Sequence, residues 1–152
     1  MEGYIMELRR LVGHRTLIQT AASVIIEDGE GRILLGRRSD NGKWDYSGGS
    51  LEIDERVEDC ARRELFEEMG LYADGLEFFM INSGPETHYI YPNGDEVSNV
   101  EIIYTCSRWH GEPVSRDGEM TELRWFSVGE LPEDISEPVM PVIREYVRRK
   151  GQ

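Results

Sequence analysis

The sequence is poor in cysteine and has no long apolar run. No stretch approaches the roughly 18 apolar residues that a membrane-spanning helix needs, so we expect no membrane contact. The two cysteines, Cys60 and Cys106, are not spaced like metal ligands, and we expect buried, reduced thiols rather than a disulfide framework. Residues 1–10 alternate charged and apolar positions without a secretory core, which favours a cytoplasmic location.

Basic charge is also scarce. Thirty acidic residues stand against 17 basic ones, for a formal charge of −13. Because such a chain repels phosphate overall, a general grip on nucleic acid is disfavoured, and phosphate binding would need metal ions and a few local arginines. Only Lys43 and Lys150 are lysines; the remaining bases are arginines, whose planar forks suit phosphate, although a compositional bias of the source genome explains the same count.

The length of 152 residues fits a single domain, 1–152, with residues 1–16 as an N-terminal extension. Hydrophobic periodicity and turn residues predict interleaved strands and helices. This pattern indicates an α/β fold with a mixed sheet between helices on both faces. The expected helices are 4–11, 55–69 and a closing helix, 138–150, that starts at Pro138 or Pro141; the expected strands are 17–26, 32–37, 75–82, 97–107 and 123–128, with a loop around Gly48 and Gly49 and a hairpin turn at 92–95.

The helix predicted over 55–69 carries its acids in an unusual place. At about 100° per residue, its glutamates lie along or beside the apolar stripe formed by Cys60, Ala61 and Leu65. A glutamate-rich helix is ordinarily a solvated face, but unpaired carboxylates on a buried stripe are costly and repel one another. Oxygen ligands spaced i, i+3 and i+4 suit Mg²⁺ or Mn²⁺. The sequence therefore predicts a divalent-metal site at Glu64, Glu67 and Glu68.

A glycine pair lies just upstream of this helix. Gly48 and Gly49 let the backbone approach a ligand closely, leaving carbonyls for a metal and amides for an anion. Such a pair alone is usually a plain turn. Beside the acidic helix it indicates metal-assisted displacement at phosphorus.

These residues complete a known signature. The chain resembles the Nudix hydrolases, strongly over 49–71 and more loosely over about 17–131. The signature consists of Gly49, then Glu55, then the run Arg63-Glu64-Leu65-Phe66-Glu67-Glu68-Met69-Gly70-Leu71. The resemblance implies a Nudix-type α/β/α sandwich with a mixed β-sheet. It also implies hydrolysis of a nucleoside diphosphate linked to another moiety, with Mg²⁺ or Mn²⁺ as cofactor.

The resemblance assigns roles to individual positions of this chain. Glu64, Glu67 and Glu68 would bind the divalent ions, and Glu64 is also a candidate general base. Arg63 would orient the neighbouring glutamate through an ion pair. Glu55 would steady the metal shell, Gly48 could lend a carbonyl to a metal, and Gly49 would lie against the substrate.

Two further positions follow less directly from the resemblance. Family members often supply another acid shortly before a late strand, here ahead of Trp125; we favour Glu119 as this metal ligand, with Glu122 as the competitor. The family also often places a phosphate-contacting arginine at the end of the second strand. Arg37 and Arg38 occupy that place, although two exposed arginines at a strand end have the same appearance.

The chain departs from the common family pattern at two positions. Ser47 stands where Pro often precedes the glycine pair, and we expect it to loosen the loop, since Pro would fix its φ. Asp54 stands where Gly often precedes Glu55, and we interpret it as a helix N-cap.

The signature implies cleavage of a phosphoric anhydride bond but does not identify the substrate that carries it. Trp44, Tyr89, Tyr91 and His88 are candidates for stacking on a base, although each is equally at home in packing or in a hairpin. The small-molecule partner is expected to be a nucleotide or a nucleotide-linked diphosphate, and nucleic acid at most an RNA 5′ end. The oligomeric state stays open, a homodimer included.

Two rival functions remain beside the hydrolase. One is a non-catalytic nucleotide-binding or sensing Nudix module, which would not need the full set of carboxylates. The other is isoprenoid diphosphate isomerisation, which needs a cysteine in the pocket. Cys60 is expected to face inward from the acidic helix and Cys106 to lie in mid-strand, so neither is well placed.

Overall fold

The computed structural model describes residues 3–151. Within that range the predicted interleaving of strands and helices is confirmed, with the bounds that follow. The helices are α1 (Tyr4–Val12), α2 (Val57–Met69) and α3 (Met140–Lys150), with 3-10 turns η1 (Pro85–Thr87) and η2 (Glu137–Val139). The strands are β1 (Leu17–Ile26), β2 (Arg32–Arg38), β3 (Trp44–Asp45), β4 (Ser47–Ser50), β5 (Leu71–Asn82), β6 (His88–Ile90), β7 (Glu96–Gly111) and β8 (Met120–Ser127).

The strands form two sheets. The larger is five-stranded and mixed, in the order β4-β1-β7-β5 with β6 also paired to β7. Its central pair is parallel, and Leu17 of β1 lies opposite Val97 of β7, whereas the other pairings are antiparallel. The smaller sheet, β3-β2-β8, is antiparallel. Parallel strands need a long connection, and here residues 27–95 supply it: the segment leaves β1 beside Cys106 and returns to the opposite end of the pair, where Val97 lies beside Leu17.

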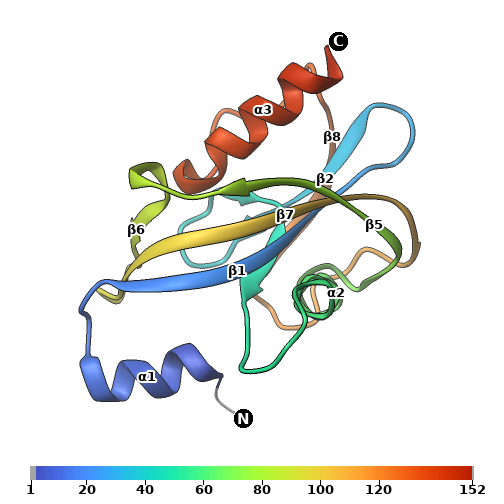
Figure 1. The fold of residues 1–152 in the computed structure, drawn as a ribbon. Helices are drawn as coiled ribbons and strands as arrows, with labels where there is room; N and C mark the ends of the chain where they lie inside the picture. Colours follow the sequence, from blue (N-terminus) through green and yellow to red (C-terminus); the bar gives the residue numbers. More distant parts are fainter. Residues whose placement is uncertain (1–2, 152) are drawn as a thin grey trace.

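Helices cover both faces of the mixed sheet (Figure 1). On one side, α2 packs Cys60, Ala61 and Leu65 against alternate residues of β1 such as Val24. On the other side, α3 packs with the opposite residues of the strands, including Ile25. This is the expected α/β/α arrangement, and the alternation of strand side chains produces it.

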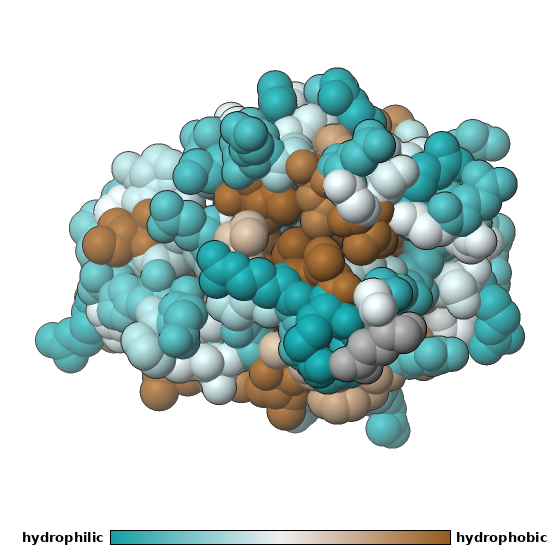
Figure 2. All heavy atoms as spheres, turned by 90° about the horizontal axis from the view of Figure 1, so that it is seen from above, coloured by the Kyte–Doolittle hydropathy of each residue, from teal (hydrophilic) through white to brown (hydrophobic). Residues whose placement is uncertain are grey.

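The core consists of two hydrophobic clusters, one on each side of the mixed sheet. Both cysteines are free and buried, as expected. Seen from above, one face shows an apolar area in its middle with hydrophilic side chains around it (Figure 2). Within residues 3–151, every helix is too short or too polar to cross a membrane.

The glycine pair lies in a strand, so the predicted loop is wrong at this point. Gly48 and Gly49 belong to β4, which pairs antiparallel with β1 and brings Gly49 opposite Ala22. Glycine has a low intrinsic preference for strands, and the backbone hydrogen bonds of β1 override it. Other bounds shift by a few residues: β5 begins at Leu71 rather than 75, β7 extends to Gly111, and β8 begins at Met120.

The start of α2 also differs from the prediction. The helix begins at Val57, and its N-cap is Arg56 rather than Asp54. Asp54 instead adopts a left-handed backbone with φ 62°. Glycine takes that conformation at lower cost, which explains why a Gly is common there and why the N-cap interpretation is wrong.

The helix expected near the start of the N-terminal extension is present as α1. α1 is separate from the sandwich and lies next to the first half of β1 (Figure 1). Its Arg9 is only 7% exposed and donates to the carbonyls of Gly13, Arg15 and Glu96. These bonds attach the helix to the start of β7.

Candidate functional site

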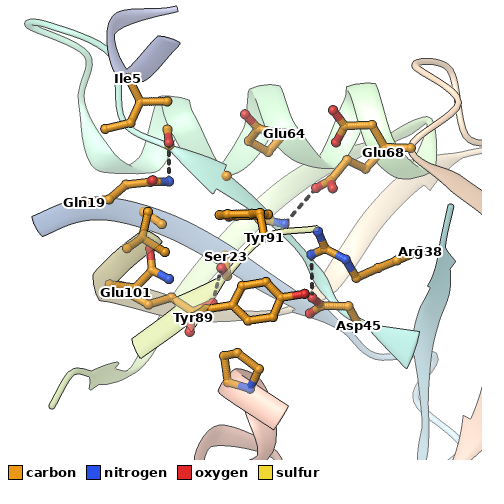
Figure 3. A pocket seen from close by; sticks show the side chains of 18 of the residues that line it. Ile5, Gln19, Ser23, Arg38, Asp45, Glu64, Glu68, Tyr89, Tyr91 and Glu101 are labelled. Carbon is orange, nitrogen blue, oxygen red and sulfur yellow. Dashed lines mark hydrogen bonds and ion pairs between the residues drawn. The ribbon is translucent and has the colours of Figure 1, made fainter. Parts of the chain in front are cut away.

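A cavity of about 830 Å³ opens between α1, α2 and the mixed sheet. Alternate residues of the two central strands form its floor, because side chains two apart share a face of a strand. The floor residues are Gln19, Ala21 and Ser23 of β1 and Val97, Asn99 and Glu101 of β7. Figure 3 shows this pocket with Glu64 and Glu68 at its α2 side and Ile5 of α1 on the opposite side of the view.

The three glutamates of α2 all line this pocket. Glu68 is 6% exposed and accepts hydrogen bonds through Oε1 from the Gly48 amide at 2.8 Å and from Ser47 Oγ at 3.3 Å. Ser47 is itself fully buried. It therefore holds a carboxylate in place, and the expectation that it loosens a loop is wrong, because strand pairing already defines its backbone.

Arg63 connects the helix to the segment before it. Its Nη1 donates to Glu64 Oε1 at 2.8 Å and lies 3.6 Å from Glu67 Oε2. Its Nε and Nη2 donate to the two oxygens of Glu55 at 2.9 and 3.0 Å. Glu55 also accepts from the Glu52 amide and lies outside the set of pocket-lining residues. Its contact with the carboxylate cluster therefore runs through Arg63.

The glycines leave no room for a side chain. A Cβ on Gly49 would lie 2.3 Å from the carboxyl carbon of Glu64, and one on Gly48 would lie 2.1 Å from Ser23 Oγ. Any larger residue at these positions would displace the carboxylate or the floor. The pair is thus required for close approach of β4 to α2 rather than for a turn.

Burial and mutual repulsion oppose ionisation of these carboxyls. Burial, opposed by Arg63 and reinforced by Glu67, raises the pKa of Glu64 to about 7. Burial and the Glu64 charge raise the pKa of Glu68 well above its usual value, and burial also raises the pKa of Glu119. A divalent cation would relieve this repulsion, so the donor set suits a hard metal ion. Among the described residues no three such side chains are already gathered around one point.

The structure separates the two competitors for the additional acid. Glu119 lines the pocket, and its charge contributes to the raised pKa values of Glu64 and Glu68. Glu122 is paired with Arg124 on β8 and is not among the lining residues. The favoured position, Glu119, is therefore the one beside the cluster.

Two residues expected to contact substrate lie elsewhere. Trp44 is 1% exposed and packs edge-to-face on Phe126 in the core beneath α3. Arg37 lies over the Trp44 ring at 4.8 Å and pairs with Asp134. Neither lines the pocket, because the antiparallel pairing of β2 and β3 places the two residues opposite each other in the smaller sheet. We therefore withdraw both as substrate contacts.

Arg38 does line the pocket but is already paired. It donates to both oxygens of Asp40, at 2.8 and 2.7 Å, and to Asp45 Oδ2 at 3.4 Å (Figure 3). A phosphate would have to compete with these carboxylates for the guanidinium. Because the arginines by the glutamates are matched by acids, the pocket as a whole attracts cations.

Of the remaining ring side chains proposed to stack on a base, two line the pocket and one does not. Tyr89 and Tyr91 line the pocket and meet edge-to-face with ring centroids 4.9 Å apart. Asn41 donates to the Tyr89 hydroxyl at 3.1 Å. His88, between Thr87 and Tyr89 on a strand, faces the other way and pairs with Glu96 at 3.2 Å.

Sequence reasoning missed two acids of the pocket. Glu101 on the floor accepts from Ser23 at 2.6 Å, Tyr46 at 3.0 Å and Asn82 at 3.3 Å. Burial raises the pKa of Asp45 to about 7, and Arg38 opposes this rise. The signal for Glu101 was present as a charged residue in step with inward-facing Val97 and Ile103 of β7.

The cysteines lie outside the pocket, although Cys60 contacts two of the residues that line it. Cys60 lies against the Gly49 and Ser50 carbonyls, and burial raises its pKa to about 12. Neither Cys60 nor Cys106 lines the pocket. The requirement of an isomerase for a pocket cysteine is therefore not met.

Fold and pocket together define an α/β sandwich with a helix-borne carboxylate site at the edge of its mixed sheet. The NUDIX domain model matches residues 17–147, and the chain belongs to the Nudix hydrolase family. It is 33% identical over 105 residues to the oxidized purine nucleoside triphosphate hydrolase of Danio rerio, covering 67% of this chain and 62% of that protein. It is 33% identical over 121 residues to a MutT-like protein of Streptomyces ambofaciens, covering 79% of this chain and 70% of that one.

The structural comparison agrees. The crystal structure of the MutT NUDIX hydrolase from Burkholderia pseudomallei matches with a TM-score of 0.70 at 25% sequence identity. The match covers 84% of this chain and 97% of that one. The fold expected from the signature is thus the fold observed.

Proposed function

We propose that this chain is a metal-dependent hydrolase of a nucleoside diphosphate linked to another moiety. The observation that carries the proposal is the convergence of Glu64, Glu67, Glu68 and Glu119 on one pocket, next to a glycine strand that admits no side chain. Carboxylates crowded in this way serve no purpose in packing, and burial raises the pKa values of Glu64, Glu68 and Glu119. The activity named for the zebrafish relative, on an oxidized purine nucleoside triphosphate, supports a nucleotide substrate.

The proposed metal site is formed by side chains of α2 and by one residue before β8. Glu64, Glu67, Glu68 and Glu119, together with the Gly48 carbonyl, would hold Mg²⁺ or Mn²⁺, whereas Glu55 acts through Arg63. When bound, the metal supplies charge neutralisation for the diphosphate and activation of water.

Glu64 is the candidate general base, because its carboxylate lines the pocket beside the other acids and can accept a proton there. Arg63 fixes its direction through the 2.8 Å contact. Gly49 allows the substrate to approach, and Tyr89 and Arg38 complete the substrate wall.

The substrate is a small nucleotide rather than a long nucleic acid. The formal charge of −13 and the pairing of the pocket arginines Arg38 and Arg63 with acids disfavour binding of a long phosphate backbone, so RNA is plausible only at a 5′ end. We also propose a cytoplasmic location, since both buried cysteines are free, which fits a reducing compartment.

A phosphate-release assay tests this function. The panel comprises nucleoside triphosphates, oxidised nucleotides, ADP-ribose, dinucleoside polyphosphates and 5′-triphosphate RNA, each with Mg²⁺, Mn²⁺ or EDTA, coupled to pyrophosphatase or phosphatase. We expect metal-dependent turnover of at least one compound and none with Glu64→Gln. If no compound of the panel releases phosphate while a nucleotide still raises the melting temperature, the chain is a non-catalytic binding module and the hydrolase proposal is wrong.

A further inference from the structure

The pocket has a wall that the family domain does not supply. The matched domain begins at residue 17, whereas α1 precedes it. Nevertheless Gly3, Ile5, Met6 and Arg9 line the pocket. Figure 3 shows Ile5 above the floor, away from Glu68. The N-terminal extension therefore encloses the part of the pocket away from the carboxylate cluster.

This wall is held in place at both ends. The Tyr4 amide donates to Glu52 Oε1 at 3.1 Å, next to the start of α2. At the other end, the buried Arg9 donates to three backbone carbonyls and lies 3.7 Å from Asp95. Its nitrogens are thus used to anchor the helix, which leaves Ile5 and Met6 as the ligand-facing side chains of α1.

Opposite this wall, one polar side chain of the floor is free. Gln19 donates to Ser50, and Glu101 is satisfied by three donors. Within residues 3–151, no hydrogen bond is formed by the Asn99 side chain, while its backbone carbonyl accepts from Thr87. An amide that carries both donors and an acceptor on a half-buried floor can recognise a matching edge of a ligand.

The remaining wall is aromatic. Tyr89 and Tyr91 meet edge-to-face at 4.9 Å and line the same cavity as Met6, which is 46% exposed. Aromatic rings and a thioether favour a flat, polarizable group between them. A nucleobase combines such a flat group with a hydrogen-bonding edge, and the proposed substrate carries one.

We propose that α1, through Ile5 and Met6, and the free amide of Asn99 recognise the nucleobase of the substrate and determine which base is preferred. This inference rests on the proposed function, since it concerns the group attached to the diphosphate at the carboxylate cluster. It makes an element outside the matched domain a determinant of specificity.

The test compares kcat/KM for dGTP, dATP, dCTP and dTTP with Mg²⁺ in the full chain. The four share their triphosphate and sugar, so a change in their ratios reports contact with the base alone. The variants are Met6→Ala and Asn99→Leu. Their matched controls are Leu11→Ala, 83% exposed on the same helix, and Ser98→Ala, next to Asn99 on β7 but outside the pocket lining.

We expect each pocket variant to change the ratio of the best to the worst nucleotide by about fivefold or more, mainly through KM, as loss of one hydrogen bond or apolar contact does. The controls should keep the ratio of the wild type. If all four nucleotides change by the same factor in the pocket variants, α1 and Asn99 have only a structural role and the inference is wrong.

A second measurement separates this inference from the hydrolase. Melting temperatures are recorded for the same proteins with the same four nucleotides and Mg²⁺. Base-dependent shifts that disappear in Met6→Ala and Asn99→Leu support base recognition even when turnover is absent. A wild-type chain that shows no base dependence in turnover or in melting temperature overturns the inference while leaving metal-dependent hydrolysis of another compound possible.

Discussion

Glu68 at the α2 side of the pocket is buried and Glu101 on its floor is partly buried, and their surroundings differ. Glu101 accepts hydrogen bonds from three uncharged side chains, Ser23, Tyr46 and Asn82. Glu68 has the Gly48 amide and Ser47 as donors and faces the like charges of Glu64 and Glu119.

The difference shows how to separate structural acids from functional ones. A buried carboxylate whose oxygens are matched by neutral donors stabilises the fold around it. A carboxylate crowded by other carboxylates destabilises the fold until a cation arrives, and such an arrangement persists where it has a use. On this criterion we assign Glu68 to the proposed chemistry and Glu101 to the scaffold.

The largest effect should come from removing the charge of Glu68. Glu68→Gln keeps the size and one acceptor but loses a charged metal ligand, so we expect kcat with Mg²⁺ to fall by about a thousandfold or more. The fold should persist, as measured by circular dichroism. Glu122→Gln, outside the pocket, serves as the control and should retain wild-type turnover. A Glu68→Gln protein with most of its activity would contradict the metal assignment.

For Glu101 on the pocket floor, we expect substitution to lower the stability of the fold. Glu101→Leu leaves the Ser23, Tyr46 and Asn82 donors without their acceptor, and we expect the free energy of unfolding to fall by about 3 kcal/mol. Urea denaturation measures this loss. Glu77→Ala, an exposed glutamate of β5, should change stability little. If Glu101→Leu is as stable as the wild type, the scaffold role of Glu101 is wrong.

A smaller, pH-dependent effect should arise from Asp45. Burial raises its pKa from 3.8 to about 7, so the folded chain holds this proton more tightly than the unfolded chain. Its contribution to stability is therefore present below about pH 4 and is lost as the pH rises to about 7.

Urea denaturation of wild type and Asp45→Asn across this range checks the sign. The stability of the wild type relative to the variant should decline with rising pH by at most about 1.4 kcal/mol per pH unit. Asp59→Asn, exposed on α2, should track the wild type. If the stability of the wild type relative to Asp45→Asn instead increases with pH, the Arg38 contact outweighs burial.

The smallest effect concerns strain beside the carboxylate cluster. Asp54 holds φ at 62°, a conformation that glycine adopts more readily. Asp54→Gly should therefore raise the free energy of unfolding by roughly 0.5–1 kcal/mol in urea denaturation. Asp59→Gly inside α2 should lower it. Loss of stability in both variants would mean that Asp54 makes a favourable contact that offsets its strain.

The Nudix signature and the helix that bears it could be predicted, because both depend on residues close together along the chain. Periodicity indicated the buried stripe of Cys60, Ala61 and Leu65, and the same spacing put the glutamates beside it. The strand character of Gly48 and Gly49 could not be predicted, because β1 supplies their hydrogen-bonding partners from more than twenty residues upstream. The same holds for Trp44, which the pairing of β2 with β3 places in the second core, and for Arg37 opposite it, which lies over the Trp44 ring.

By itself, the sequence determined the family and the acidic helix and predicted a divalent cation as its ligand, since those follow from residue type and spacing within one element. Tertiary structure alone decided which other side chains share the pocket. Parallel pairing of β1 with β7 aligns Asn99 with Gln19 and Glu101 with Ala21, and the contacts of Arg9 place α1 over that floor. These neighbours are some eighty residues apart in sequence, and only the shared burial and hydrogen bonding of the folded sheet bring them together.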